Sequence, residues 1–307
     1  KFIRKQREKE VNKVTAIGEI LWDVYPDQKR LGGAPFNFIY HIWKILGKAN
    51  FISSVGKDEK GREIISYLNS IGFNTSNIYI DSEHPTGTVK VTLEEDRTPK
   101  FTISPECSYD YITLYNTTEN LIENETDILY FGTLSTRSEI SRNTIQSLFE
   151  KKHIKYFCDL NLRHNFYTRE LIEQSLQTSN VIKINETELE KLKQLFTLEN
   201  SNDLAIEQLF NKFGIELIGL TLGKDGAVLY NKSESHRCKS EVINVIDTLG
   251  AGDAYSAILC LGYLHGWAIE KINKLAMRFA GEICTVDGAF PEEDSFYVHY
   301  QNRFRRN

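Results

Sequence analysis

Short apolar runs alternate with longer amphipathic runs along most of this chain, and this alternation most restricts its fold. The short runs contain few polar residues, which is typical of strands buried on both faces of a parallel sheet. The longer runs repeat apolar residues at helical spacing. The pattern predicts an α/β fold in which helices flank a central, mostly parallel β-sheet. The expected strands are Val14–Ile20, Asn50–Val55, Asp127–Phe131, Lys155–Leu160, Val181–Asn185, Leu217–Leu222 and Ala227–Tyr230, and the main expected helices are Pro35–Leu46, Glu59–Ile71, Ser138–Lys151, Glu186–Phe196 and Asp203–Phe213.

Two segments break this rhythm. In Leu21–Gly32 apolar and polar residues alternate, and no helix follows until Pro35. Gly87–Ser104 alternates on both sides of a charged turn, which predicts a two-stranded hairpin with one apolar face. We interpret both segments as a small β-sheet, the β lid, that can cover a ligand. The predicted division is an α/β core of residues 14–20, 34–83 and 111–291, a lid of 21–33 and 84–110, and terminal extensions of 1–13 and 292–307.

Charge and cysteine content narrow the class of protein. The net charge is −5 and the isoelectric point about 5.9, which argues against a nucleic-acid binder. No apolar run approaches the roughly 18 residues of a membrane span. Residues 1–13 are basic but lack the apolar region of a signal peptide. The five cysteines form no C-x-x-C pair, so we expect a reducing compartment, the cytoplasm, and no cysteine metal site.

The strongest chemical signal is DTLGAGD at Asp247–Asp253, followed by apolar residues at helical spacing. A helix is therefore expected to begin near Gly252, with Gly250 and Ala251 in a small-residue loop before it. Unpaired backbone N–H groups at such a helix start bind anions. Asp253 could simply pair with the helix dipole. Beside an anion hole, however, its carboxylate can also accept the proton of a hydroxyl that attacks a bound phosphoryl group.

DTLGAGD resembles the second signature of the PfkB (ribokinase-like) carbohydrate kinases, and GGAPFN at Gly32–Asn37 resembles the first. The resemblance extends over most of Val14–Pro291, and GEILWDVYP at Gly18–Pro26 is similar to the fructokinase branch in particular. It implies a ribokinase-like fold and an ATP-dependent transfer of the γ-phosphoryl group to a primary hydroxyl of a small sugar, with fructose favoured. Asp253 would be the general base, and Gly250, Ala251 and Gly252 the anion hole.

The same resemblance implies a sugar site. Asp23, Gly32, Gly33 and Asn37 fall on positions that face the sugar in this family, and a carboxylate or amide is well suited to bind hydroxyls. Glycine at position 33 would let the substrate approach the backbone. Arg163, in DLNLR, is the best candidate for a cation facing phosphate or substrate, although an ordinary surface arginine fits the sequence equally well.

Two further motifs match the nucleotide side of the family. Asn185 and Glu188 fit its N-x-x-E pattern, which places Asn185 on phosphate oxygens and Glu188 on hydrated Mg²⁺. An acidic, solvated helix start would look the same. TLGKDG, with Thr221, Gly223 and Gly226, is similar to the nucleotide-phosphate turn, although it also suits a simple hairpin. The ATP-binding residues implied in total are Asn185, Thr221, Gly223, Gly226, Gly250 and Gly252.

Several points stay open at this level. Members of the family often bind a monovalent cation with an aspartate at the position of Asp247 and carbonyls near Gly288, so a need for K⁺ is undecided. The substrate could instead be ribose, 2-keto-3-deoxygluconate or a nucleoside. A non-catalytic sugar sensor is the other class, although a decayed kinase should lose Asp253 or the glycines first. The partners expected are a sugar and ATP, without nucleic acid or membrane. The apolar hairpin could also join a homodimer.

Overall fold

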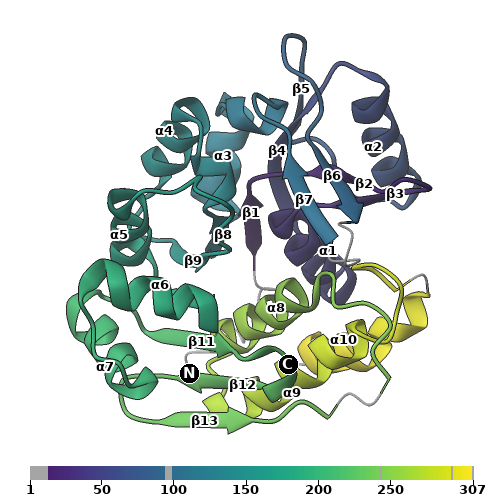
Figure 1. Cartoon of the computed structure of the whole chain (residues 1–307). Coiled ribbons are helices and arrows are strands. Elements are labelled where there is room, and N and C mark those ends of the chain that lie inside the picture. The colour runs from purple at the N-terminus through teal and green to yellow at the C-terminus, as the bar shows by residue number, and fades with distance from the viewer. Residues whose placement is uncertain (1–12, 94–98, 242–243, 292, 306–307) are drawn as a thin grey trace, which may run out of the picture.

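The computed structural model describes residues 13–93, 99–241, 244–291 and 293–305. Within them, nine strands form one sheet in the order β13-β12-β11-β10-β9-β8-β1-β4-β5 (Figure 1). All neighbours from β5 to β11 pair parallel, and β12 and β13 are antiparallel. This confirms the mostly parallel sheet. The strands are β1 (Val14–Ile17), β4 (Asn50–Gly56), β5 (Ile78–Asp81), β8 (Ile128–Gly132), β9 (Lys155–Asp159), β10 (Val181–Asn185), β11 (Leu217–Thr221), β12 (Ala227–Tyr230) and β13 (Ser235–Cys238).

The first strand is shorter than its sequence suggested. It ends at Ile17 instead of Ile20, because the chain turns at Gly18, whose φ is 150°. A Cβ atom at Gly18 would lie 2.6 Å from Cγ of Pro35, so only glycine lets the strand exit pass this close to the next helix. The remaining predicted strands agree with the structure to within one residue at each end.

Helices cover both faces of the sheet, and each face has its own apolar core. One core is packed by α1 (Ala34–Leu46), α2 (Glu59–Ser70), α8 (Ala251–Leu264), α9 (Ile269–Ile283) and α10 (Val298–Phe304). The other is packed by α3 (Asn116–Asn124), α4 (Glu139–Leu148), α5 (Arg169–Thr178), α6 (Glu186–Phe196) and α7 (Asn202–Lys212). No helix in the described part of the chain is long and apolar enough to cross a membrane.

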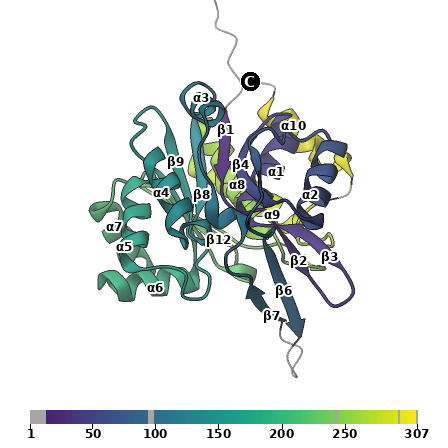
Figure 2. The same ribbon diagram turned by 90° about the horizontal axis from the view of Figure 1, so that it is seen from above.

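A second sheet of four strands, β3-β2-β6-β7, joins the two segments that break the strand–helix rhythm. Its strands are β2 (Leu21–Val24), β3 (Lys29–Gly32), β6 (Thr88–Leu93) and β7 (Pro99–Ile103). The β6–β7 hairpin confirms the predicted antiparallel pair, with Val89 opposite Ile103. Parallel pairing of β2 with β6 makes one sheet of the two segments. Figure 2 shows this sheet at one side of the molecule, with β6 and β7 projecting away from the core.

Residues 298–304, expected within a terminal extension, form α10 and bury Tyr300 and Phe304 in the core. The helix packs beside α1.

The sheet topology marks one edge as the place for a ligand. Strand β1 has β4 on one side and β8 on the other, so the order of the parallel strands reverses there. In open α/β sheets, ligands bind beyond the carboxyl ends of the strands at such a reversal. The segments after β1, β8, β9, β10 and β11 all leave the sheet at this edge.

Candidate active site

The start of α8 is a helix N-terminus without a side-chain cap. The helix begins at Ala251, and its N-cap residue Gly250 has a left-handed backbone with φ of 75°. A Cβ atom at Gly250 would lie 2.6 Å from Cβ of Ala289, so the loop depends on glycine both for its backbone and for its packing. No side chain caps this end. The Ala251 N–H donates to the Thr248 carbonyl at 3.3 Å, whereas the N–H groups of Gly250 and Gly252 have no partner among the described residues and can bind an anion.

Asp253, in the first turn of α8, accepts a hydrogen bond of 2.8 Å from Nδ2 of Asn37 on α1. Burial, with the nearby charge of Asp159, raises the pKa of Asp253 to about 7, while donation by Asn37 and the charges of Lys183 and Arg163 oppose that rise. Oδ1 of Asn37 is buried and has no partner within the described residues. The pair therefore presents a carboxylate with a pKa near neutrality and an unused acceptor side by side.

A buried ion pair lies behind the anion hole. Nζ of Lys183, on β10, is 3.2 Å from Oδ1 of Asp159 at the end of β9, and both side chains are at least nine-tenths buried. The other oxygen of Asp159 accepts a bond from the Ser256 hydroxyl. A Cβ atom at Gly252 would lie 3.0 Å from Nζ of Lys183. The lysine thus places a positive charge directly against the small-residue loop, where it complements an anion.

The two glycines of GGAPFN let the chain pack tightly around Asp23 and Glu19. A Cβ atom at Gly32 would lie 2.4 Å from Oδ2 of Asp23, and one at Gly33 would lie 2.4 Å from the carbonyl oxygen of Glu19. Gly33 also has φ of 110°, a backbone that favours glycine. Both carboxylates are almost fully buried at the start of the small sheet. Burial raises the pKa of Asp23 to about 6 and also raises the pKa of Glu19.

The Arg163 side chain is exposed on the loop after β9 and faces these acids. Its charge lowers the pKa of Glu19, Asp23 and Asp253, in each case against the larger effect of burial. Its guanidinium makes no hydrogen bond or ion pair with the residues that the structure describes. Arg163 is therefore available to a ligand that lies between the two aspartates.

Asn185 and Glu188 form a reciprocal cap at the start of α6. Oδ1 of Asn185 accepts the Glu188 N–H at 2.9 Å, and Oε2 of Glu188 accepts the Asn185 N–H at 2.8 Å. Oε1 of Glu188 accepts the N–H of Leu162 at 2.9 Å. Both carboxylate oxygens thus already hold backbone donors, and burial raises the pKa of Glu188. A local structural role accounts for this spacing on its own.

TLGKDG is the tight turn of the β11–β12 hairpin. Thr221 ends β11 opposite Asn185 at the end of β10, which brings the two predicted ATP segments side by side. Its hydroxyl donates to the carbonyl of Ile184. Gly226 is required sterically, because a Cβ atom there would lie 1.9 Å from the carbonyl oxygen of Cys238. Gly223 has φ of 54° and open space around it.

The chain is similar in sequence and fold to carbohydrate kinases. The model of the pfkB family of carbohydrate kinases matches residues 12–294. The chain belongs to this family. It is 27% identical to a fructokinase of Vibrio alginolyticus (88% of this chain, 91% of that relative) and 29% identical to a 5-dehydro-2-deoxygluconokinase of Halalkalibacterium halodurans (80% and 77%). A solved structure of a Pyrococcus horikoshii sugar kinase in complex with ATP superposes with a TM-score of 0.79 at 25% identity, covering 95% of this chain and 99% of that one.

Family membership makes the chain an ATP-dependent sugar kinase with a ribokinase-like fold. Within this kinase, Asn37 bonds to Asp253, and Gly32 lies against Asp23. The charge of Arg163 acts on both aspartates, Asp23 and Asp253.

The structure adds functional candidates that sequence reasoning missed. Lys183 and Asp159 lie beneath the glycine loop, and Glu19 lies beneath the diglycine. The signal for Lys183 was a charge inside the apolar run VIKIN, which a purely structural strand rarely contains. Arg30, on β3, gave no signal, because both of its partners lie more than 200 positions away in sequence.

Asp247, at the position for which cation binding was left undecided, is bound by the protein itself. Its Oδ2 accepts a bond of 2.8 Å from Nη1 of Arg30 and one of 3.2 Å from the Gly288 N–H, and its Oδ1 accepts the N–H of Leu249 at 3.0 Å. A guanidinium at this distance repels a second cation, so the residues around Asp247 do not fit a potassium site.

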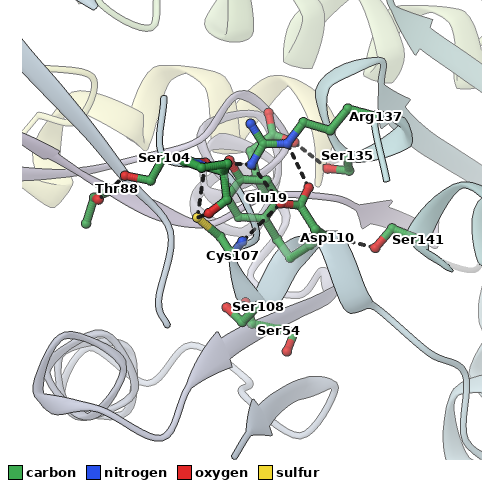
Figure 3. Close-up of polar contacts among 12 residues, drawn as sticks. Glu19, Ser54, Thr88, Ser104, Cys107, Ser108, Asp110, Ser135, Arg137 and Ser141 are labelled. Carbon is green, nitrogen blue, oxygen red and sulfur yellow. Dashed lines mark hydrogen bonds and ion pairs between the residues drawn. The ribbon is translucent and has the colours of Figure 1, made fainter. Parts of the chain in front are cut away.

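Arg137 holds the segment that follows strand β7 of the small sheet (Figure 3). Arg137 donates from Nε and Nη2 to the two oxygens of Asp110, at 2.8 and 2.7 Å, and from Nη2 to the Ser104 carbonyl. Both side chains of this pair are at least nine-tenths buried. Glu19 lies behind it and accepts the Ser135 hydroxyl at 2.6 Å. This cluster anchors the segment after β7 to the core.

Proposed function

We propose that this kinase transfers the γ-phosphoryl group of ATP to a primary hydroxyl of a small sugar, with fructose as the first candidate. The observation that carries the proposal is the contact of Asn37 with Asp253 at an uncapped, glycine-rich helix start. A base and an anion hole within one helical turn are the two parts that phosphoryl transfer to a hydroxyl requires.

In this proposal the sugar lies between Asp23, Asn37 and Asp253. Asp253 accepts the proton of the attacking hydroxyl, and its pKa near 7 suits a base that works at neutral pH. The unpartnered Oδ1 of Asn37 accepts a second sugar hydroxyl, which satisfies a buried acceptor. Gly32 and Gly33 leave the backbone open to the sugar.

The phosphates lie over Gly250, Ala251 and Gly252, where backbone N–H groups and the helix dipole offset their charge. Lys183 adds a fixed positive charge from below. The nucleotide extends along the neighbouring strand ends that carry Asn185 and the turn of Thr221, Gly223 and Gly226.

Mg²⁺ enters this scheme with the nucleotide. Among the described residues, no group of three or more His, Cys, Asp or Glu side chains is placed to hold a metal. That fits an ion whose ligands are phosphate oxygens and waters, with one or two carboxylates nearby. Glu188, already bonded to two backbone N–H groups, would act through water rather than as a direct ligand. The ion neutralises charge on the phosphates when it is bound.

The Arg163 side chain favours a second candidate substrate. Its exposed guanidinium has no partner among the described residues, and arginine pairs well with a carboxylate. A sugar acid such as 2-keto-3-deoxygluconate would use it, whereas fructose would not.

A sugar panel separates these candidates. The protein is incubated with Mg-ATP and with fructose, ribose, a nucleoside or 2-keto-3-deoxygluconate, and ADP release is measured. We expect the highest kcat/KM with fructose. If the protein prefers 2-keto-3-deoxygluconate and this preference disappears in Arg163→Gln, the sugar acid replaces fructose as the proposed substrate. If no compound in the panel stimulates ADP release, the result contradicts sugar transfer.

We also propose that residues 21–33 and 84–110 act as a lid over the core, and that the hairpin can join a homodimer. Val91 is buried, but Phe101 opposite it is 40% exposed, which leaves an apolar edge. Phe101→Ser should lower the dimer fraction in light scattering, and an unchanged molar mass would rule out this interface.

The five free cysteines support a cytoplasmic location.

A further inference from the structure

Arg30 bridges the small sheet and the loops behind the anion hole. It lies on β3, directly opposite Asp23 on β2. Its Nη1 binds Asp247, and its Nη2 donates to both oxygens of Asp287 at 2.7 and 2.9 Å. The Arg30 side chain is only 19% exposed, and its guanidinium also lies over the ring of Tyr25.

Asp247 is the residue through which this contact reaches the active site. It begins the DTLGAGD loop, and its carboxylate holds the N–H groups of Leu249 and Gly288. The backbone at positions 246 and 247 also bonds to the carbonyl of Cys284. Asp247 therefore sets the path of the loop that ends in Gly250. Its negative charge lies near the place proposed for phosphates and would oppose them unless a cation balanced it.

A mobile ion and a side chain could each supply that balance. An ion bound at Asp247 would need oxygen ligands and no competing positive charge. Here a permanent cation already lies 2.8 Å from Oδ2, and the Gly288 N–H takes the other lone pair of the same oxygen. Because arginine stays protonated at every working pH, its charge is present without any ion.

We infer that Arg30 is a built-in substitute for a monovalent cation at Asp247, so that this kinase does not depend on potassium. The substitute comes from the small sheet, whereas an ion would come from solvent. Neutralisation of the anion-hole loop is therefore tied to the position of β3.

The first arm of the test measures thermal unfolding without any substrate, in KCl and in tetramethylammonium chloride of equal ionic strength. The wild-type midpoints should differ by less than about 1 °C, because no ion binds selectively to the folded state. In Arg30→Met the Asp247 carboxylate is exposed to an ion, and K⁺ should raise the midpoint by about 3 °C or more relative to tetramethylammonium. Lys29→Met, on the same strand but paired with Glu63, is the matched control and should stay insensitive.

The second arm measures turnover in the same salts and rests on the proposed phosphoryl transfer. Wild type and Arg30→Lys should keep kcat within about twofold between the salts, because each retains a cation beside Asp247. Arg30→Met should lose at least about tenfold in tetramethylammonium and regain most of that in KCl. A merely structural arginine would give a loss that no ion restores.

Either arm can overturn the inference. A wild-type midpoint raised several degrees by K⁺ would show that an ion site exists beside Arg30. An Arg30→Met variant with no response to K⁺ would show that Arg30 does not replace an ion. If Arg30→Met fails to fold in both salts, Arg30→Gln keeps a hydrogen-bonding end group without charge, and its response to K⁺ decides instead. If the protein is inactive with every sugar, the proposed function is contradicted. The thermal unfolding measurements need no substrate and still test the role of Arg30.

Discussion

Helices α6 and α8 both begin at the carboxyl edge of the central sheet, but their N-termini are completed in opposite ways. At α6 the side chains of Asn185 and Glu188 bond to each other's backbone N–H groups. At α8 the N-cap is Gly250, which has no side chain to accept a backbone N–H of the first turn. A capped start is stabilising and closed, whereas an uncapped one leaves several donors for a ligand.

The motif residues at the two helix starts therefore serve different needs. Both starts carry acidic residues in their first turn and both match family patterns. The chain meets its own hydrogen-bonding needs at α6, so the residues there are explained by folding alone. At α8 they are not, because the glycines forgo a cap that serine or aspartate would supply. We therefore expect substitutions at α8 to affect catalysis and those at α6 to affect mainly stability.

The largest effect should come from Asp253→Asn at α8. It removes the proton acceptor but keeps a side chain that can bond to Asn37, so turnover should fall by about 10²-fold or more with binding of ATP and sugar nearly unchanged. Glu186→Gln, an exposed acid in the first turn of α6, is the matched control and should leave turnover unaltered. Steady-state kinetics measure the turnover of both variants. If Asp253→Asn keeps a third or more of wild-type turnover, Asp253 is not the general base.

Gly252→Val should lower turnover by about tenfold or more while changing ATP affinity less, because a side chain there crowds the N–H groups that serve the transferring phosphoryl group. It also approaches Lys183. Gly250→Ala provides the contrast within the same loop. It should chiefly lower the free energy of unfolding, because its backbone is left-handed and its Cβ would meet Ala289. Collapse of ATP binding in Gly252→Val with single-turnover chemistry intact would reverse this assignment.

The pKa of Asp253 predicts a pH profile. Turnover should be constant above about pH 7 and fall below it, with a limiting slope of about tenfold per pH unit, because only the carboxylate can accept the proton. Stability should change in the opposite direction. The folded pKa lies above the unfolded value of about 3.9, so this group's contribution weakens as pH rises between the two. Asp253→Asn should flatten both pH dependences. If turnover of this variant still falls below pH 7, another group causes that fall.

The smallest effects are expected at α6. Asn185→Ala should lower the free energy of unfolding by about 1 kcal/mol, because the cap is lost. Asn185→Asp keeps an acceptor for the Glu188 N–H and should preserve most of that stability, yet it should raise the KM for ATP if the amide contacts phosphate. Thr168→Ala, which removes the cap of α5, is the matched control and should affect stability alone. Equal KM values in all three variants would leave Asn185 a structural residue only.

Much of the fold follows from local pattern. The strands and the hairpin were predictable because burial on both faces, or on one, leaves a periodic signature in adjacent residues. The joining of β2 with β6 was expected only in outline, since their register depends on contacts between distant segments. Strands β5 and β13 lie at the sheet edges and are partly exposed, so they lack the apolar runs of the inner strands.

In the candidate site, too, features set by neighbouring residues were predictable, and features set by distant contacts were not. The DTLGAGD loop was predictable because its small residues and the following helix are contiguous. The i,i+3 spacing of Asn185 and Glu188 did not distinguish a cap from a ligand site, because both need the two side chains on one face. The ion pairs of Arg30 were beyond sequence reasoning, since nothing near Arg30 in the chain indicates its partners.

Helix α10 has a consequence for how the protein is made. The side chains of Gln301 and Arg305 donate to the carbonyls of Lys44 and Ile45 at the end of α1, and the Tyr297 hydroxyl bonds to His41. The helix that presents Asn37 is thus completed by residues synthesised some 250 positions later. While the ribosome still holds these late residues, α1 lacks its final neighbours and part of its apolar surface is uncovered. Until α10 docks, this uncovered apolar surface of α1 favours aggregation of the incomplete chain.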